Sequence, residues 1–251
     1  MYHWQRRSAP SQNQALIADG RFALVKTTLL DYPGRVAAAV FLPGCPLRCP
    51  YCHNPGFVNL NRLSEPLNAD MSLLKNFLAK RARLLGGIVY SGGEALTHPL
   101  LPELMETAEH FSLPVKLDTA GLYPEALYTL LKDNKLSYVA VDLKTSPERY
   151  SEVGWKKSGE NAALALRSTL EMLRNFKVDF EVRTTVVPGL VEKEELQKLS
   201  GLAELAPLWV LQNYLPGDTL NPAWGNLTPF GEEKLRELAD SISARVPITV
   251  R

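Results

Sequence analysis

The sequence predicts an α/β protein whose central β-sheet is mainly parallel. Short apolar runs alternate with amphipathic helical stretches along the 251 residues, and the connections between them are short. Most of the apolar runs are nearly continuous, which is typical of parallel strands covered on both faces. These observations leave two arrangements open, an open sheet and an incomplete barrel.

The expected elements form six strand–helix units in chain order. Nearly continuous apolar runs predict strands at residues 36–42, 87–91, 115–119, 138–143, 180–187 and 209–214. Helical spacing of apolar residues predicts helices at residues 71–85, 101–111, 124–133, 161–176, 193–205 and 232–245. We expect a loose polar extension at residues 1–20 and a single domain at 21–251, because no repeat, low-complexity tract or shift in composition marks a second domain.

Charge and hydropathy exclude several classes of protein. Twenty-eight Lys and Arg balance 27 Asp and Glu, so the chain lacks the broad basic surface of a nucleic-acid binder. No apolar run approaches the roughly 20 residues that span a membrane. The polar start, MYHWQRRSAPSQNQ, lacks the apolar core of a secretion signal. We expect a soluble cytoplasmic protein with no nucleic-acid or membrane partner.

All three cysteines, Cys45, Cys49 and Cys52, lie within eight residues in the segment GCPLRCPYCHNP. A disulfide framework needs an even number of cysteines spread along the chain. A closed zinc site needs a fourth ligand, and His53 is too close to Cys52 to complete one. Three thiolates from one loop can hold a [4Fe–4S] cluster and leave one iron open. The pattern favours this cluster over zinc and over three unrelated core cysteines.

The segment CPLRCPYCHNP resembles the cluster motif of the radical S-adenosylmethionine (SAM) superfamily, with Tyr51 directly before the last cysteine. The Tyr-Cys-His-Asn continuation is similar to that of the glycyl-radical-enzyme activating enzymes. The segment KTTLLDYPGRVAAAVFLPGC is similar to the anaerobic ribonucleoside-triphosphate reductase activating proteins. Further likeness follows in SGGEA, KLDTAG, YVAVDLK, FEVRTTVVPGLV and LQNYLPGDTL, so the resemblance covers residues 26–222.

The resemblance implies a partial (β/α)6 barrel of TIM type, which decides between the two arrangements left open above. It implies that Cys45, Cys49 and Cys52 hold a [4Fe–4S] cluster, that SAM binds at the open iron, and that Tyr51 belongs to the cofactor site. In such barrels the functional residues gather where strands end and loops begin. The remaining motifs follow the expected strands in this way.

Gly92, Gly93 and Glu94 follow the second expected strand. Glycines permit close backbone approach, so the segment is either a tight strand–helix turn or a place where exposed peptide groups bind the ammonium and carboxylate of a ligand. The resemblance assigns the three residues to the methionyl amino group of SAM. Ala95 stands where the family usually has proline, and Ala120 departs from the family pattern Asp-Thr-Asn-Gly, in which Asp118 still matches.

Asp142 closes a buried apolar strand, where a carboxylate is costly to dehydrate, so we expect it to meet Lys144 or a ligand. The resemblance assigns Asp142, Lys144 and Asp118 to SAM and allows the acidic residues to hold a monovalent cation. Glu181 and Arg183 share one strand face. Arg183 can form a fork to the SAM carboxylate or pair with Glu181.

The activity that the resemblance implies needs no catalytic side chain beyond the cluster and SAM ligands. One electron from a flavodoxin- or ferredoxin-like donor cleaves SAM, and the 5′-deoxyadenosyl radical takes a hydrogen atom from a glycine Cα in a glycyl-radical enzyme. The expected partner is an anaerobic ribonucleotide reductase. Two alternatives stay open: a radical SAM enzyme that acts on a small molecule, for example in modified purine synthesis, and a non-catalytic metal-binding adaptor.

Overall fold

The computed structural model describes residues 19–63 and 67–251. They form one eight-stranded sheet in which the strands follow one another in chain order, from β1 to β8. The first 18 residues of the expected N-terminal extension lie outside the described residues, so the division into an extension and one domain stays a prediction.

The six expected strands are all present, each within one residue of its predicted ends. They are parallel to one another: β2 (Ala37–Leu42), β3 (Gly87–Gly92), β4 (Val115–Thr119), β5 (Tyr138–Asp142), β6 (Asp179–Val186) and β7 (Trp209–Asn213). Two strands that the sequence pattern did not predict form the edges, β1 (Ala23–Thr28), antiparallel to β2, and β8 (Ile248–Val250), parallel to β7. Only Leu24 is buried in β1, and β8 has three residues, so neither contains an apolar run.

A helix follows each of the six predicted strands: α3 (Met71–Arg81), α4 (Leu101–His110), α5 (Pro124–Lys132), α6 (Gly159–Phe176), α7 (Lys193–Ala203) and α8 (Glu232–Asp240). A short helix, α2 (Pro55–Val58), follows the cysteines, and 3-10 turns span Leu60–Arg62, Ala82–Leu84, Ala95–Thr97, Pro147–Val153 and Pro222–Trp224. The helix predicted to end at residue 245 ends at Asp240. Pro247 disfavours helical backbone in the residue before it, and Ile242 and Val246 pack into the core.

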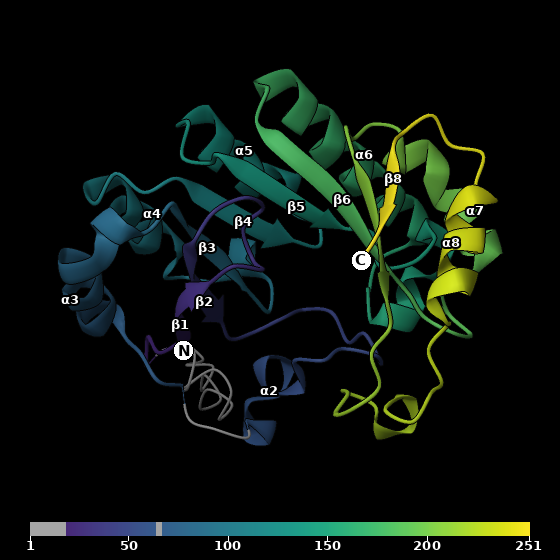
Figure 1. Cartoon of the computed structure of the whole chain (residues 1–251), viewed down its shortest axis with the longest axis horizontal. Coiled ribbons are helices and arrows are strands. Elements are labelled where there is room, and N and C mark those ends of the chain that lie inside the picture. The colour runs from purple at the N-terminus through teal and green to yellow at the C-terminus, as the bar shows by residue number, and fades with distance from the viewer. Residues whose placement is uncertain (1–18, 64–66) are drawn as a thin grey trace, which may run out of the picture.

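The strand order confirms the partial barrel. A doubly wound sheet reverses its strand order at a switch point, whereas here each strand pairs with its neighbour in sequence from one edge to the other. In Figure 1 the strands form an arc, helices α3 to α8 lie along its outer side, and α2 lies on the open inner side. The six units β2–α3 to β7–α8 are therefore the (β/α)6 barrel that the resemblance implies.

Alternate residues of the strands point to two different environments. Leu117, Val141 and Val182 belong to the core between sheet and helices. The opposite, inner face carries a small apolar cluster of Tyr32, Ala37, Ala39 and Val89. The register places charged residues on that same inner face, because Lys116 pairs with Val89, and Asp142 pairs with Arg183. The inside of the barrel is thus apolar near the amino ends of the strands and charged toward their carboxyl ends.

Candidate active site

A cavity of about 220 Å³ lies at the carboxyl ends of the strands. All of the site residues that the sequence predicts line it: Cys45, Cys49, Tyr51, Cys52, Gly92, Gly93, Glu94, Asp118, Asp142, Lys144 and Arg183. These residues come from the loop after β2 and from the ends of β3, β4, β5 and β6. The fold therefore brings together segments that are up to 138 positions apart in the sequence.

The cysteine loop, residues 43–54, is held from both sides by other loops. On one side the N–H of Arg48 donates to the carbonyl of Val153 at 2.7 Å. On the other side the N–H of Leu220 donates to the carbonyl of Cys52 at 3.1 Å. The ring of His53 stacks on Tyr214, with ring centres 5.5 Å apart. These contacts make the position of the cysteines depend on the whole carboxyl end of the barrel.

The three thiols fit a [4Fe–4S] cluster. All three are free; Cys49 is buried, and Cys45 and Cys52 are partly exposed on the cavity. Among the residues that the structure describes, no three His, Cys, Asp or Glu side chains are grouped to hold one metal ion. A cluster differs from such a site because each cysteine binds a different iron. Burial raises the pKa of Cys45 to about 11 and that of Cys49 to about 12, so iron binding has to displace thiol protons.

The Gly-Gly-Glu turn, residues 92–94, packs backbone to backbone against the start of the cysteine loop. The N–H of Gly93 donates to the carbonyl of Leu42 at 2.8 Å, and the N–H of Glu94 donates to the carbonyl of Gly44 at 2.9 Å. A Cβ on Gly93 would lie 2.0 Å from the Gly44 oxygen, and Gly92 has a φ of +109°. Both positions therefore require glycine.

These two hydrogen bonds also correct the expectation that exposed peptide groups of the turn bind both ends of an amino acid. The N–H groups of Gly93 and Glu94 are used within the protein. A ligand bound through this part of the turn meets carbonyl oxygens, which accept hydrogen bonds from an ammonium group and do not bind a carboxylate.

The buried carboxylate of Glu94 connects the turn to the end of β4. One of its oxygens accepts from the hydroxyl of Thr119 at 2.9 Å and the other from the N–H of Ala120 at 2.9 Å. Burial raises the pKa of Glu94, and these hydrogen bonds oppose that shift. Because Ala120 contributes its backbone, the family's polar side chain at this position is not needed for the contact. Glu94 thus positions two loops of the site relative to each other.

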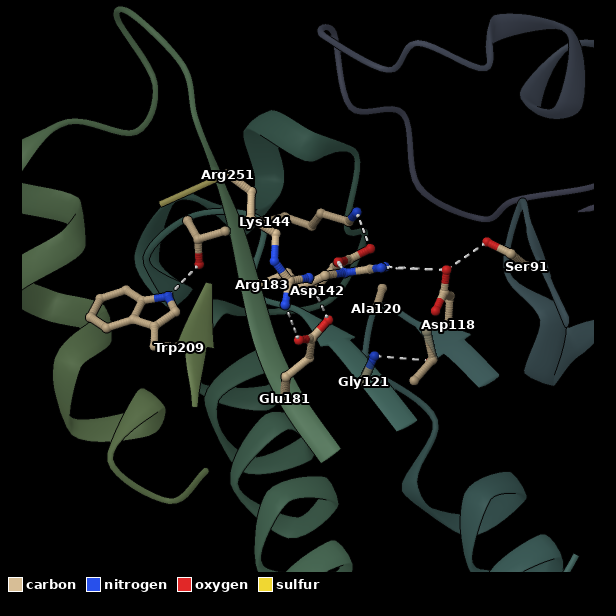
Figure 2. A network of polar contacts seen from close by, with 12 residues as sticks. Ser91, Asp118, Ala120, Gly121, Asp142, Lys144, Glu181, Arg183, Trp209 and Arg251 are labelled. Atoms are coloured by element: carbon tan, nitrogen blue, oxygen red, sulfur yellow. Dashed lines mark hydrogen bonds and ion pairs between the residues drawn. The ribbon is translucent and has the colours of Figure 1, made fainter. Parts of the chain in front are cut away.

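Two carboxylates, Asp118 and Asp142, and two cations, Lys144 and Arg183, form the charged floor of the cavity (Figure 2). Lys144 Nζ lies 2.9 Å from one oxygen of Asp142, and Arg183 Nε lies 2.8 Å from the other. Arg183 Nη2 also lies 3.4 Å from Asp118, which forms a further ion pair with the buried Lys116. Burial alone would raise the pKa of Asp142, but Arg183 and Lys144 outweigh it and hold the pKa well below its usual range.

The ion pairs show which partners Asp142 and Arg183 have within the protein. Asp142 meets Lys144, as expected. The alternative pairing of Arg183 with Glu181 is wrong, because Glu181 forms its ion pair with Arg251 at 3.2 Å. Both floor carboxylates form ion pairs with cationic side chains of the protein. Lys144 and Arg183 line the cavity together with the carboxylates of Glu94, Asp118 and Asp142. With Lys116 buried beneath Asp118, three cations stand against three carboxylates.

Tyr51 joins the cysteine loop to the end of β5. Its hydroxyl donates to the carbonyl of Lys144 at 3.2 Å, and the hydroxyl of Tyr150 accepts from the N–H of the same residue at 3.2 Å. Two buried tyrosines therefore fix the backbone of Lys144 while its ammonium reaches Asp142.

Sequence reasoning missed three contributors to the site. Ser91 and Thr185 line the cavity, and the hydroxyl of Ser91 donates to Asp118 at 3.0 Å. Lys116 lies beneath Asp118, with its side chain 2% exposed. The available signal was the two-residue spacing of Lys116 and Asp118, which puts both on one strand face. The segment 211–214 lies outside the cavity lining, and the side chain of Asn213 donates to the Phe230 carbonyl at 2.7 Å.

Comparison with known proteins agrees with this site. A sequence model described as the radical SAM superfamily matches residues 39–199. A protein of Methanocaldococcus jannaschii whose name describes a glycyl-radical enzyme activating enzyme is 30% identical over 220 residues, which cover 86% of this chain and 88% of that protein. The pyruvate formate-lyase-activating enzyme of Clostridium pasteurianum is 32% identical over 179 residues, covering 69% of this chain and 71% of the relative.

Solved structures share the fold. A radical SAM methyltransferase from Sphaerobacter thermophilus matches with a TM-score of 0.61 at 17% identity, over 97% of this chain and 82% of that one. Streptococcus suis SuiB bound to S-adenosylmethionine matches with a TM-score of 0.60 at 13% identity, over 82% of this chain and 48% of that one. Within residues 19–63 and 67–251, no helix is both long and apolar enough to cross a membrane.

Proposed function

The chain belongs to the radical SAM superfamily, whose cofactors are a [4Fe–4S] cluster and SAM, and we propose that it activates a glycyl-radical enzyme, specifically an anaerobic ribonucleotide reductase. The observation that carries the proposal is the single cavity in which the three cysteines meet the Gly-Gly-Glu turn and the charged floor. The two relatives described above, whose names describe activating enzymes, support the same class of reaction.

Different residues of the cavity would hold different parts of the cofactors. Cys45, Cys49 and Cys52 would hold three irons of the cluster. The turn at residues 92–94 offers carbonyl oxygens to the ammonium group of SAM, because its N–H groups at Gly93 and Glu94 are already used. Lys144 and Arg183, the two cations of the cavity lining, would meet the SAM carboxylate. When bound, the reduced cluster and SAM supply a 5′-deoxyadenosyl radical that removes a hydrogen atom.

Contacts within the protein hold the charged floor. Asp142 is held by Arg183 and Lys144 at 2.8–2.9 Å, and the backbone of Lys144 is held by two tyrosines. A floor fixed in this way needs little reorganisation to accept a ligand, which is the advantage of preorganised polar groups in a partly buried site.

A glycyl-radical partner is supported by the family-specific segments of the chain. The Tyr-Cys-His-Asn continuation and residues 26–45 resemble the reductase-activating branch. All three cysteines of the sequence belong to the cysteine loop, so none is left for an auxiliary cluster of the kind that many peptide-modifying relatives use.

The test mixes the reconstituted, reduced protein with SAM and an anaerobic ribonucleotide reductase under strict exclusion of oxygen. We expect the EPR signal of a glycyl radical on the reductase and an equivalent amount of 5′-deoxyadenosine. A reductase with alanine in place of its radical glycine should give no such signal. Rapid 5′-deoxyadenosine formation that needs a small molecule, with no radical on the reductase, would reject the proposed partner.

A further inference from the structure

A second cavity, of about 350 Å³, lies beside the cysteine loop. It is formed between this loop and the loops that follow β4 and β5, and its lining includes Pro46, Arg48, Tyr123, Trp155, Lys156 and Lys157. We call this set the cationic face. None of these residues lines the active-site cavity.

The cysteine loop lies between the two cavities. Cys45, Leu47 and Cys49 line the active-site cavity, whereas the residues between them, Pro46 and Arg48, line the second one. The alternation places the cationic face directly behind the thiols. The cysteine loop therefore lies between the cationic face and the active-site cavity.

The cationic face is positively charged, and its aromatic rings contact each other and a lysine. Arg48, Lys156 and Lys157 are exposed, and the lining of this cavity contains no acidic residue. Lys157 Nζ lies 5.5 Å from the ring centre of Trp155, and Tyr123 packs edge-on against the same ring. The guanidinium of Arg48 donates to the carbonyls of Cys45 and Leu47, which keeps this cation against the cysteine loop.

In the proposed function SAM and the target glycine occupy the active-site cavity during turnover. That cavity is therefore not a route for an electron-transfer protein during turnover. The face behind the cysteines stays accessible at that stage, and its three cations complement a negatively charged surface. A molecule with exposed acidic residues around its own redox centre would meet this surface with its centre close to the cluster.

We propose that the cationic face is the docking site of a small acidic electron-transfer protein, an inference that rests on the proposed function. In the step that docking allows, one electron leaves the reduced flavin of the donor, which passes from hydroquinone to semiquinone. The same electron lowers the total oxidation state of the cluster by one, and no bond forms or breaks in this chain. The lysines act by holding the donor; they take no part in hydrogen abstraction.

The test measures binding of a flavodoxin, as an acidic donor, to the wild-type protein and to the double variant Lys156→Glu/Lys157→Glu by calorimetry. Both lysines are exposed, so the variant should fold normally. The matched control is Lys132→Glu/Lys177→Glu, which makes the same charge change at exposed positions near the amino ends of β5 and β6. Binding is measured with cluster-free and cluster-loaded protein, so the readout does not depend on activity.

We expect the first variant to bind about tenfold more weakly, or worse, at about 0.1 M salt, and the control to change by less than about twofold. The difference should shrink toward none at about 1 M salt, where the screening length falls to about 3 Å. Equal weakening in both variants, or none in the first, would overturn the docking site.

A second reductant separates this inference from the proposed function. Photoreduced deazaflavin, which needs no docking site, should reduce the cluster at the same rate in the wild type and in Lys156→Glu/Lys157→Glu, and reduction by flavodoxin hydroquinone should be slow in the variant. If deazaflavin reduces the wild-type cluster and no SAM cleavage follows, the proposed function fails, whereas the binding measurement still tests the docking site.

Discussion

Replacing Gly93 with alanine should separate the Gly-Gly-Glu turn from the cysteine loop. The new Cβ would lie 2.0 Å from the Gly44 oxygen and 3.2 Å from the Cys45 nitrogen. Both atoms belong to the backbone, so no side-chain rotation relieves the contact. The Gly44 oxygen is also the acceptor for the Glu94 N–H at 2.9 Å. Relief of the clash therefore moves apart the two segments that this hydrogen bond joins.

The expected magnitude follows from the hydrogen bonds that this separation breaks. Two backbone hydrogen bonds, from Gly93 to Leu42 and from Glu94 to Gly44, each contribute about 0.5–1.5 kcal/mol. Residual strain adds a similar amount, because a shift of more than about 1 Å is needed in a packed interior. We expect a decrease of about 2–4 kcal/mol in the free energy of unfolding. For a domain of this size that corresponds to a fall of about 5–15 °C in Tm.

The assay is denaturant unfolding of the cluster-free protein together with iron and sulfide content after anaerobic reconstitution. Gly201→Ala is the matched control, because Gly201 lies in α7 and a Cβ there meets nothing within 4 Å. Alanine in a helix interior should stabilise by up to about 1 kcal/mol. Unchanged stability and full cluster loading in Gly93→Ala would refute the claim that this close approach positions the cysteine loop.

Two further predictions concern the charged floor. Lys116→Met should lower the free energy of unfolding by about 3 kcal/mol in urea titrations, because it leaves the Asp118 carboxylate without its most buried partner. The double variant Lys116→Met/Asp118→Asn should recover part of that decrease. Equal stability of the wild type and Lys116→Met would contradict this expectation. Asp142 has a pKa held below its ordinary value of about 3.9, so its contribution is complete above about pH 4 and is lost as the pH falls toward the folded-state pKa. Unfolding free energies measured between about pH 5 and pH 2 should therefore fall less steeply in Asp142→Asn than in the wild type, and parallel curves would show that the ion pairs of Asp142 do not stabilise the fold.

The sequence predicts the strands and helices well because the buried strands are continuous apolar runs. It misses β1, in which only Leu24 is buried, and β8, which is too short to show a pattern. The barrel itself follows from the family resemblance, since the same alternation of strands and helices suits an open sheet. The strand order that distinguishes the two arrangements depends on pairings between distant residues.

The residues of the site were predictable, but their contacts were not. Motifs at strand ends identify Asp142 and Arg183, and the register of β5 with β6 makes them partners. Lys116 is read from the sequence as part of an apolar strand, and its role appears only when the inner face of the barrel is known. The motif identifies Glu94, but not the contacts of its carboxylate with Thr119 and Ala120. In each case the partner lies on another strand or loop, beyond the reach of local sequence patterns.

An EPR spectrum of the anaerobically reconstituted, dithionite-reduced protein, recorded without and with SAM, is the decisive measurement for the cofactor site. We expect the signal of a reduced [4Fe–4S] cluster that changes when SAM is added, and no such cluster in Cys49→Ala. A cluster whose spectrum is the same with and without SAM, or no cluster in the wild type, would contradict the radical SAM site and favour a metal-binding adaptor.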